Sequence, residues 1–268
     1  MHGLGNDFMV IDGINQKINL TPEQIKQWSD RRFGIGFDQL LLVEKPLTEQ
    51  AEFLYRIYNA DGSEVEQCGN GARCFARFVV DKGLTTSSII PVETSSGLIK
   101  LKLVGELVEV DMGAPVFEPQ ALPFVAEQPA DEYSVDVDGQ AVTFGAVSMG
   151  NPHAVIRIDD VNSAEVETLG PKMESHSLFP NRVNVGFMQV VDRASIRLRV
   201  YERGAGETLA CGTGACAAVV SGVQRGWLDP QVRVSLAGGD LTISWPGGDA
   251  PVLMTGPATT VFEGQIEQ

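Results

Sequence analysis

The chain has 268 residues, 35 of them acidic and 20 basic, so its formal net charge is −15 at pH 7. Because nucleic-acid-binding proteins need clustered lysine and arginine to displace counterions, this acidity argues against a nucleic-acid partner. Hydrophobic residues make up 43% of the chain, which is ordinary for a protein with a buried core and argues against global disorder. No stretch approaches 18 uninterrupted apolar residues, and the first residues lack the basic start and apolar run of a secretory signal. We therefore expect a cytoplasmic protein that does not interact with membranes.

Helix signals occur at three places along the chain. Thr21, followed by proline and then by Gln24, has the pattern of a capping box and predicts a helix start. Residues 72–82 and 213–225 are predicted to be helices that end at a glycine, Gly83 and Gly226 respectively. Both segments are apolar nearly all round in their middles, so we expect each helix to be buried at the centre of a sheet.

Strand signals occur between and after the two buried helices. Alternating apolar and polar residues predict half-buried antiparallel strands at 98–103 and 107–110. A tight hairpin is predicted at Asp138-Gly139, between strands 133–137 and 141–144, and another at Gly238-Gly239-Asp240, before a strand at 241–245. Long-range strand pairing around a central helix, occurring twice, predicts an α+β architecture.

An internal repeat organises the whole chain. The segment RIYN at 56–59 leads nine residues later to CGNGA at 68–72, and RVYE at 199–202 leads nine residues later to CGTGA at 211–215. These matches share an offset of 143 residues, as do the segments ending at Gly113 and Gly256, whereas Gly5-Asn6 and Gly150-Asn151 are offset by 145. The repeat predicts two homologous halves, residues 1–113 and 114–256, followed by a tail at 257–268.

The four cysteines are Cys68 and Cys74 in the first half and Cys211 and Cys216 in the second, with five and four residues between them respectively. The spacing within each pair fits neither a CxxC redox motif nor the usual zinc sites, and a chain without an export signal is expected to keep its thiols reduced. Cys74 and Cys216 lie among apolar helical residues, so we interpret them as small buried hydrophobes.

Cys68 and Cys211 each come directly before a glycine-rich turn that opens a predicted helix. The unpaired N–H groups there carry partial positive charge, which favours a thiolate and can also bind a carboxylate. Two such thiols on opposite sides of one cleft would suit inversion of a carbon next to a carboxylate, with one removing a proton and the other returning one. The helix termini would stabilise the charge that develops.

Three further residues are interpreted from the repeat. His153 follows Gly150-Asn151-Pro152 and is the histidine expected to face the cleft, whereas His2 and His176 are expected to be structural or solvated. Glu202 introduces a charge where the first half has Asn59, so it is either functional or a surface carboxylate. Arg203 beside it could bind a carboxylate or form a salt bridge.

At these residues the sequence resembles the diaminopimelate epimerase family, essentially from end to end. The matching segments are HGLGNDF at 2–8, NADGS at 59–63 with CGNGAR at 68–73, GNPH at 150–153, the stretch 176–184, and ERG at 202–204 with CGTG at 211–214. The resemblance implies an enzyme that needs no cofactor and converts LL-2,6-diaminopimelate to the meso form, on the route to lysine and bacterial cell-wall precursors. It also implies two pseudo-symmetric halves, each a curled, mostly antiparallel sheet around a central helix, with the tail returning to the first half.

The resemblance also implies roles for individual residues. Cys68 and Cys211 match the acid/base pair, with Cys68 as proton donor and Cys211 as acceptor in one direction, and His153 and Glu202 match positions that tune the thiols. The backbone at Gly69-Asn70 and at Gly212-Thr213 is expected to hold the reacting carboxylate. The positions that match substrate contacts are Asn6, Gln39, Asn59, Asn151, Asn184, Glu202 and Arg203.

Two features depart from the family pattern. Family members usually carry a short apolar strand before the first motif, whereas this chain begins at Met1-His2, so either the first half lacks an edge strand or the start lies upstream. The family commonly forms homodimers, and Phe262 occupies a place where some members have a tyrosine at the dimer contact. We expect a homodimer whose strength depends on that change.

Three alternative functions stay open at this point. A proline or hydroxyproline racemase would share the paired cysteines, although Asn59, Asn184 and Arg203 suit the distal end of an extended amino acid better than a compact ring. A thiol redox protein would use Cys68 and Cys211 as a reversible disulfide. A binding module without catalytic activity is the third alternative.

Overall fold

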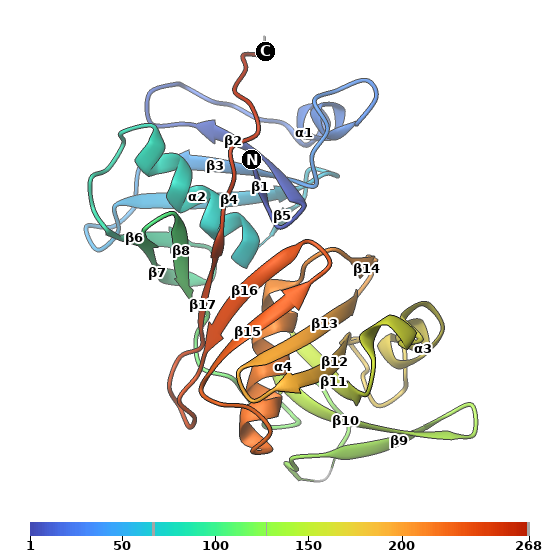
Figure 1. Ribbon diagram of the computed structural model, residues 1–268. Helices are drawn as coiled ribbons and strands as arrows, with labels where there is room; N and C mark the ends of the chain where they lie inside the picture. Colours follow the sequence, from blue (N-terminus) through green and yellow to red (C-terminus); the bar gives the residue numbers. More distant parts are fainter. Residues whose placement is uncertain (66–67, 127, 267–268) are drawn as a thin grey trace. The chain divides into compact units, whose positions relative to one another are not determined.

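The structure is a computed structural model that describes residues 1–65, 68–126 and 128–266. The chain divides into two compact units (Figure 1): unit 1 comprises Met1–Asp111 with Thr255–Gln268, and unit 2 comprises Met112–Met254. In the described part of the chain, no helix is long and apolar enough to cross a membrane.

Unit 1 is a curled mixed sheet with a helix at its centre. Neighbouring strands run in the order β1-β2-β3-β4-β6-β7-β8, with β5 beside the end of β4; β2–β3 and β4–β6 are parallel and the other pairs antiparallel. Helix α2 packs against β1, β2, β3, β7 and β8. The elements are β1 (His2–Gly3), β2 (Asn6–Asp12), α1 (Pro22–Ser29), β3 (Gln39–Glu44), β4 (Phe53–Asn59), β5 (Glu64–Val65), α2 (Gly69–Asp81), β6 (Ile89–Thr94), β7 (Gly97–Val104) and β8 (Leu107–Asp111).

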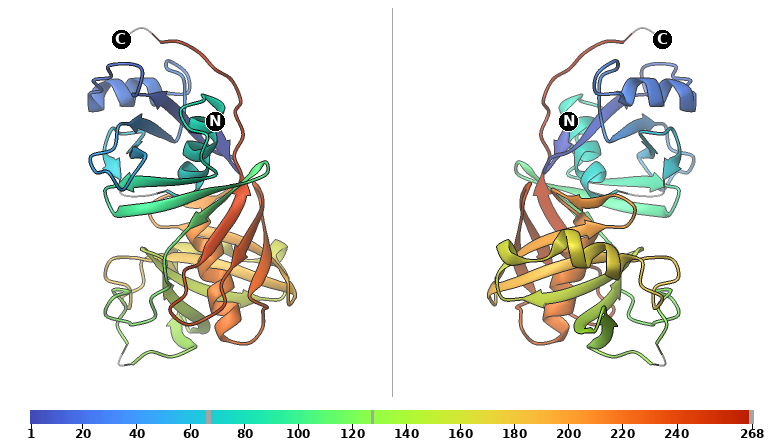
Figure 2. Two further views of the ribbon diagram at one scale, coloured as in Figure 1. Left: turned by 90° about the vertical axis from the view of Figure 1, so that its left-hand side faces the viewer. Right: turned by 90° about the vertical axis from the view of Figure 1, so that its right-hand side faces the viewer.

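Unit 2 has the same architecture. Its strands run in the order β9-β10-β11-β12-β13-β15-β16, with β14 beside the end of β13, and α4 lies among them (Figure 2). The elements are β9 (Tyr133–Val137), β10 (Gln140–Ser148), β11 (Pro152–Ile158), the 3-10 helix η1 (Val161–Ser163), α3 (Val166–Glu174), β12 (Asn184–Asp192), β13 (Ser195–Glu202), β14 (Gly206–Thr208), α4 (Gly212–Gln224), β15 (Gln231–Leu236) and β16 (Gly239–Ser244); β17 (Leu253–Pro257) begins in unit 2 and ends in unit 1.

The strand registers of the two units match position by position. In unit 1 Gln39 pairs with Phe8 on one side and with Asn59 on the other, and Leu40 pairs with Tyr58. In unit 2 Asn184 pairs with His153, and the next residue, Val185, pairs with Tyr201. An arginine–glutamate pair also recurs: the guanidinium of Arg56 holds Glu64 through two hydrogen bonds of 2.7 and 2.8 Å, and Arg199 holds Glu207 through two of 2.6 and 2.8 Å. In each unit this ion pair links the two strands that precede the Cys-Gly segment, β4 and β5 in unit 1 and β13 and β14 in unit 2.

The predicted α+β class is confirmed, and so are the predicted start of α1, the predicted ends of α2 and α4, and the first predicted hairpin turn. Thr21 caps α1 in a capping box with Gln24. Gly83 and Gly226, just after α2 and α4, have φ of +65° and +70°, values that glycine adopts without strain. The Asp138-Gly139 hairpin forms with both residues at positive φ, as a primed turn requires.

Two local predictions need correction. The second hairpin turns at positions 237–238, because Leu236 already pairs with Gly239, so the glycine pair predicted to form the turn lies partly in β16. Helix α4 is buried almost all round, as predicted. Helix α2 is not: Phe78 and Val80 are only half-buried, so its partly exposed face includes apolar side chains.

The C-terminal segment belongs to unit 1. The backbones of His2 and Thr259 exchange two hydrogen bonds of 2.9 and 3.0 Å, and Lys82 at the end of α2 pairs with Glu263 at 2.6 Å. Phe262, between these two contacts, is 66% exposed. At the other end of the chain β1 spans only His2–Gly3, whereas β10, its equivalent in unit 2, extends over Gln140–Ser148.

Candidate functional site

Cys68 is the N-cap residue of α2 in unit 1. Its backbone is extended, and its thiol lies 3.7 Å from the Oδ1 atom of Asn6, at the start of β2. The same Oδ1 accepts a hydrogen bond of 3.3 Å from Nδ2 of Asn70, in the first turn of α2. Gly69 and Asn70 are buried, so the sequence brings the predicted acid, the predicted carboxylate-binding turn and Asn6 together in one half-site.

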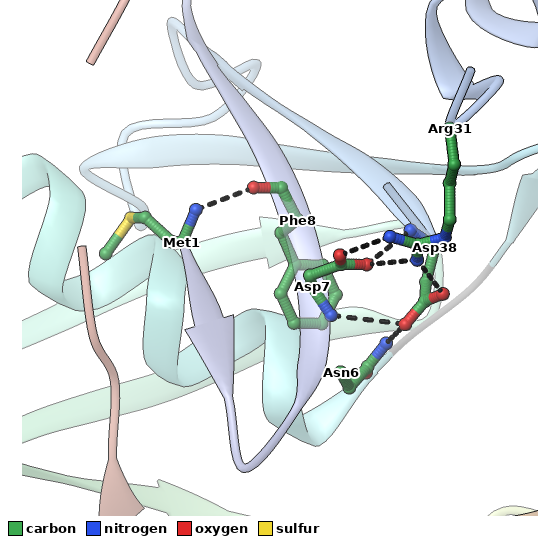
Figure 3. A network of polar contacts seen from close by, with 6 residues as sticks. All are labelled: Met1, Asn6, Asp7, Phe8, Arg31 and Asp38. Atoms are coloured by element: carbon green, nitrogen blue, oxygen red, sulfur yellow. Dashed lines mark hydrogen bonds and ion pairs between the residues drawn. The ribbon is translucent and has the colours of Figure 1, made fainter. Parts of the chain in front are cut away.

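Asn6 is itself held by an ion-pair network (Figure 3). Its Nδ2 donates to the Asp38 carboxylate at 2.9 Å, and that carboxylate also accepts from Arg31 at 2.7 Å. Arg31 makes two further hydrogen bonds of 2.8 Å to Asp7, so one guanidinium joins both carboxylates. Partial burial would raise the pKa of Asp7, but hydrogen bonds from Arg31 and the Asp38 backbone outweigh it and the pKa is lowered.

Gln39 and Asn59 form a second polar pair in unit 1. Gln39 Nε2 donates to Asn59 Oδ1 at 3.0 Å, and Asn59 Nδ2 donates to the Ser63 hydroxyl at 3.2 Å. The two residues are register partners: Gln39 is the first residue of β3 and Asn59 is the last residue of β4. Both amides therefore lie at the same edge of the sheet.

Cys211 is the N-cap residue of α4 in unit 2. Its sulfur accepts a hydrogen bond of 3.3 Å from the Gly214 backbone N–H and lies 3.6 Å from the Thr213 hydroxyl. Burial and the nearby Glu202 carboxylate raise the pKa of Cys211 well above its usual value, although the contacts from Thr213 and Gly214 act in the opposite direction. Cys211 is therefore a thiol in this half-site, and it becomes a base only if its proton is taken up.

Glu202 is positioned by a residue that sequence analysis missed. Its carboxylate accepts a hydrogen bond of 2.5 Å from the Thr208 hydroxyl, on the neighbouring strand β14. The repeat contained a signal for Thr208: it occupies the place of Val65, so a hydroxyl replaces a methyl opposite the position where glutamate replaces Asn59.

The remaining predicted residues of unit 2 make two sets of polar contacts, one around His153 and one around Asn184, both of which are buried. Burial and, secondarily, the charge of Arg203 lower the pKa of His153 to about 3, so the ring is neutral, and its Nε2 lies 3.0 Å from Asn151 Oδ1. Asn184 donates to the Pro152 carbonyl at 3.0 Å and accepts from the Arg203 backbone N–H at 2.9 Å. The Arg203 side chain is exposed and donates to the Asn181 carbonyl at 3.1 Å.

The other two thiols and the other two histidines are not part of these half-sites. Cys74 and Cys216 are fully buried, and burial raises the pKa of Cys74 to about 12. His2 and His176 each accept a backbone N–H within their own turn, which agrees with the structural interpretation. All four cysteines are reduced rather than joined in disulfides.

The sequence profile described as diaminopimelate epimerase matches residues 1–118 and 145–261. The chain belongs to the diaminopimelate epimerase family. A relative named diaminopimelate epimerase from Ectopseudomonas mendocina (strain ymp) is 61% identical over 99% of this chain and 97% of its own length, and one of the same name from Pseudomonas syringae pv. tomato is 60% identical over the same shares.

Solved structures of proteins with other names share this fold. A structure described as a probable proline racemase from Agrobacterium radiobacter K84 superposes with a TM-score of 0.68, covering 99% of this chain and 91% of that one at 17% identity. At that identity the likeness shows the shared fold alone. It confirms the expected fold class, while the family membership distinguishes this chain from the racemases.

Proposed function

We propose that this chain interconverts LL- and meso-2,6-diaminopimelate without a cofactor, with Cys68 and Cys211 as the two acid/base groups. The observation that carries the proposal is the identity of about 60%, over nearly the whole length, to relatives named diaminopimelate epimerase. Two thiols at duplicated helix N-termini support it, because inversion of a carbon needs a proton acceptor on one face and a donor on the other.

In one direction the Cys211 thiolate removes the α-proton and the Cys68 thiol delivers a proton to the opposite face, and the roles exchange in the reverse direction. The resting Cys211 has a raised pKa, so its proton must first leave, and the adjacent Glu202 carboxylate is the group that can accept it. His153 is neutral and fixes Asn151 by a hydrogen bond, so its tuning role is to hold polar groups in place rather than to carry charge.

Substrate binding is assigned to the polar groups beside each thiol. The backbone N–H groups of the first turns, at Gly69-Asn70 and Gly212-Thr213, would hold the carboxylate of the reacting end and stabilise the charge that forms next to it. Fixing the distal end raises the effective concentration of the reacting carbon. The side chains proposed for substrate contacts are Asn6, Gln39, Asn59, Asn151, Asn184, Glu202 and Arg203.

We also propose a cytoplasmic homodimer. Phe262 and its neighbour Val261 are 66% and 63% exposed on a segment tied to α2 by the Lys82–Glu263 ion pair, so an apolar surface is presented by an anchored part of unit 1. A dimer contact at Phe262 would cover this surface.

The test is solvent deuterium incorporation at the α-carbon of LL-diaminopimelate by reduced protein. Cys68→Ala and Cys211→Ala are each expected to abolish complete epimerisation, and serine at either position should cripple it, because an alcohol is a far weaker acid than a thiol. Cys74→Ala is the matched control and should retain turnover. Near-normal rates in either catalytic variant would contradict the two-thiol scheme.

The same assay separates the alternatives. Turnover of proline with none of diaminopimelate would favour a racemase. Activity that requires an oxidant would favour a redox protein, and a reduced protein that exchanges no α-proton of either substrate would be a binding module.

A further inference from the structure

Four polar side chains at the start of α2 form a continuous hydrogen-bonded chain. Arg73 Nη2 donates to Asn70 Oδ1 at 3.0 Å, and Asn70 Nδ2 donates to Asn6 Oδ1 at 3.3 Å. Asn6 Nδ2 in turn donates to Asp38 at 2.9 Å. We call this series, Arg73–Asn70–Asn6–Asp38, the amide relay.

The direction of every hydrogen bond in the amide relay is fixed by its ends. A guanidinium can only donate and a carboxylate can only accept, whereas each amide has one donor and one acceptor side. Asn70 must therefore turn its oxygen to Arg73, and Asn6 must turn its nitrogen to Asp38. With both ends charged, neither amide can reverse without placing like groups against each other.

The consequence falls on Cys68, because the atom of Asn6 that faces its sulfur is Oδ1. An oxygen of this kind only accepts, so the hydrogen bond exists only while Cys68 carries its proton, and such a bond stabilises the thiol over the thiolate. We propose that Asp38 and Arg73 are positioning residues that fix the Asn6 amide so that Cys68 rests as the proton-donating thiol. This inference rests on the proposed function for its catalytic meaning.

Both ends of the relay are anchored independently of Asn6. Asp38 is held by Arg31, which also holds Asp7, and the Asp38 backbone N–H donates to Asp7 at 2.8 Å (Figure 3). Arg73 is completely buried, and its Nε donates to the Pro257 carbonyl at 3.1 Å. The relay is thus a fixed frame into which the two amides fit in one orientation.

Unit 2 has no equivalent relay at the matching positions. The repeat places Val183 at the position of Asp38 and Cys216 at that of Arg73, so neither charged end is present. Asn151, the counterpart of Asn6, has its Oδ1 against His153, and Cys211 accepts a hydrogen bond from the Gly214 N–H. The two thiols therefore lie in different surroundings: the Asn6 oxygen accepts from the Cys68 thiol, whereas Cys211 accepts from the Gly214 N–H, whose effect on the pKa is outweighed by burial and Glu202.

The test measures the reactivity of Cys68 directly. Full-length reduced protein is alkylated with iodoacetamide across a pH series, and modification of Cys68 is followed by peptide mass spectrometry, which separates it from the other thiols. Either end of the relay alone orients both amides, because Arg73 acts on Asn6 through Asn70, so Asp38→Asn is combined with Asn70→Ser. An amide at position 38 and a hydroxyl at position 70 can each donate or accept, which frees Asn6 to turn its nitrogen to the sulfur. For this double variant we expect the pH midpoint for Cys68 alkylation to fall by at least about half a unit and kcat to fall roughly tenfold, whereas Asp38→Asn alone should keep the wild-type midpoint.

The controls separate orientation from charge. Asp7→Asn removes the same charge from the same network but leaves the Asp38–Asn6 hydrogen bond, and Asp38→Glu keeps a group that only accepts, so both should stay near the wild-type midpoint. The charged and titratable groups on the neighbouring described elements, which are unchanged in every variant, are the Met1 ammonium, His2, Arg31, Tyr55, Arg73 and Cys74.

The proposal is overturned if the Asp38→Asn, Asn70→Ser double variant leaves the midpoint unchanged, or if Asp7→Asn moves it equally. If that double variant does not fold by circular dichroism, Asp38→Ser combined with Asn70→Ser makes the same comparison, because a hydroxyl can also donate. Alkylation requires no substrate, so failure of the relay is distinct from failure of the proposed function, which wild-type deuterium incorporation tests separately.

Discussion

Gly71 in the first turn of α2 offers a sharp test of how the Cys68 half-site is packed. A Cβ atom at this position would lie 2.4 Å from the Tyr55 hydroxyl oxygen and 3.3 Å from atoms of Leu41 and Phe8. Tyr55 is buried, and its ring packs on Phe75 with the centroids 4.9 Å apart, so the hydroxyl cannot swing away. The perturbation is Gly71→Ala, alone and combined with Tyr55→Phe.

The magnitude follows from two opposing terms. Overpacking a core typically costs about 1–3 kcal/mol, and alanine recovers at most about 1 kcal/mol of helix propensity over glycine. We therefore expect Gly71→Ala to lower the free energy of unfolding by about 1–2 kcal/mol. In the described part of the chain the Tyr55 hydroxyl has no hydrogen-bond partner, so Tyr55→Phe alone should change stability by less than about 1 kcal/mol.

The assay is a double-mutant cycle in urea, followed by circular dichroism and compared at equal m-values. Removing the hydroxyl makes room for the new methyl, so the double variant should recover most of the loss and give a coupling energy of about 1–2 kcal/mol. Gly71→Ala should also lower kcat, because it displaces the turn that carries Cys68, and Tyr55→Phe should restore it. Additive effects in the cycle would refute the packing argument.

Three further predictions concern buried histidine and cysteine side chains. Because the pKa of His153 is about 3 in the folded protein but near 6.5 when unfolded, the unfolded chain binds its proton first. The stabilisation from neutral His153 is therefore complete above about pH 6.5 and is lost towards pH 3. Between pH 6.5 and 5 the urea-derived free energy of unfolding of the wild type should fall by about 2 kcal/mol more than that of His153→Gln. Equal falls in the two proteins would contradict this prediction. Cys74 has a pKa of about 12, so iodoacetamide at pH 8 should label Cys68 and not Cys74 in peptide maps. Cys74→Ala and Cys216→Ala should each lower the urea-derived free energy of unfolding by about 1 kcal/mol while retaining deuterium incorporation, and loss of exchange would show that these thiols affect catalysis.

The parts of the fold that local chemistry determines could be predicted from the sequence. The capping box at Thr21 and the glycines after α2 and α4 were placed correctly, because each depends on backbone preferences of a few neighbouring residues. The turn at 237–238 was misplaced, because either of two adjacent glycines could close the hairpin and the register is chosen by packing along β15 and β16.

The candidate site was predictable where the repeat duplicated it and much less so where it did not. Cys68 and Cys211 could be singled out as candidates because both the cysteine and its glycine-rich turn occur twice. Asp38 and Thr208 were missed, because their importance lies in what they touch: one fixes Asn6 across 32 residues of chain, and the other holds Glu202 from a neighbouring strand. Hydrogen bonds of this kind leave no local pattern.

The differences between the repeats explain why a duplicated scaffold can hold two unlike thiols. Strand register makes Phe8, Gln39 and Asn59 equivalent to His153, Asn184 and Glu202, so unit 1 has an apolar ring and two amides where unit 2 has an imidazole, an amide and a carboxylate. A symmetric pair of thiols would have nearly equal pKa values, and its resting proton would sit on either sulfur. An amide oxygen lies beside the Cys68 thiol, whereas burial and a carboxylate raise the pKa of Cys211, so the duplicated scaffold gives its two thiols different polar surroundings.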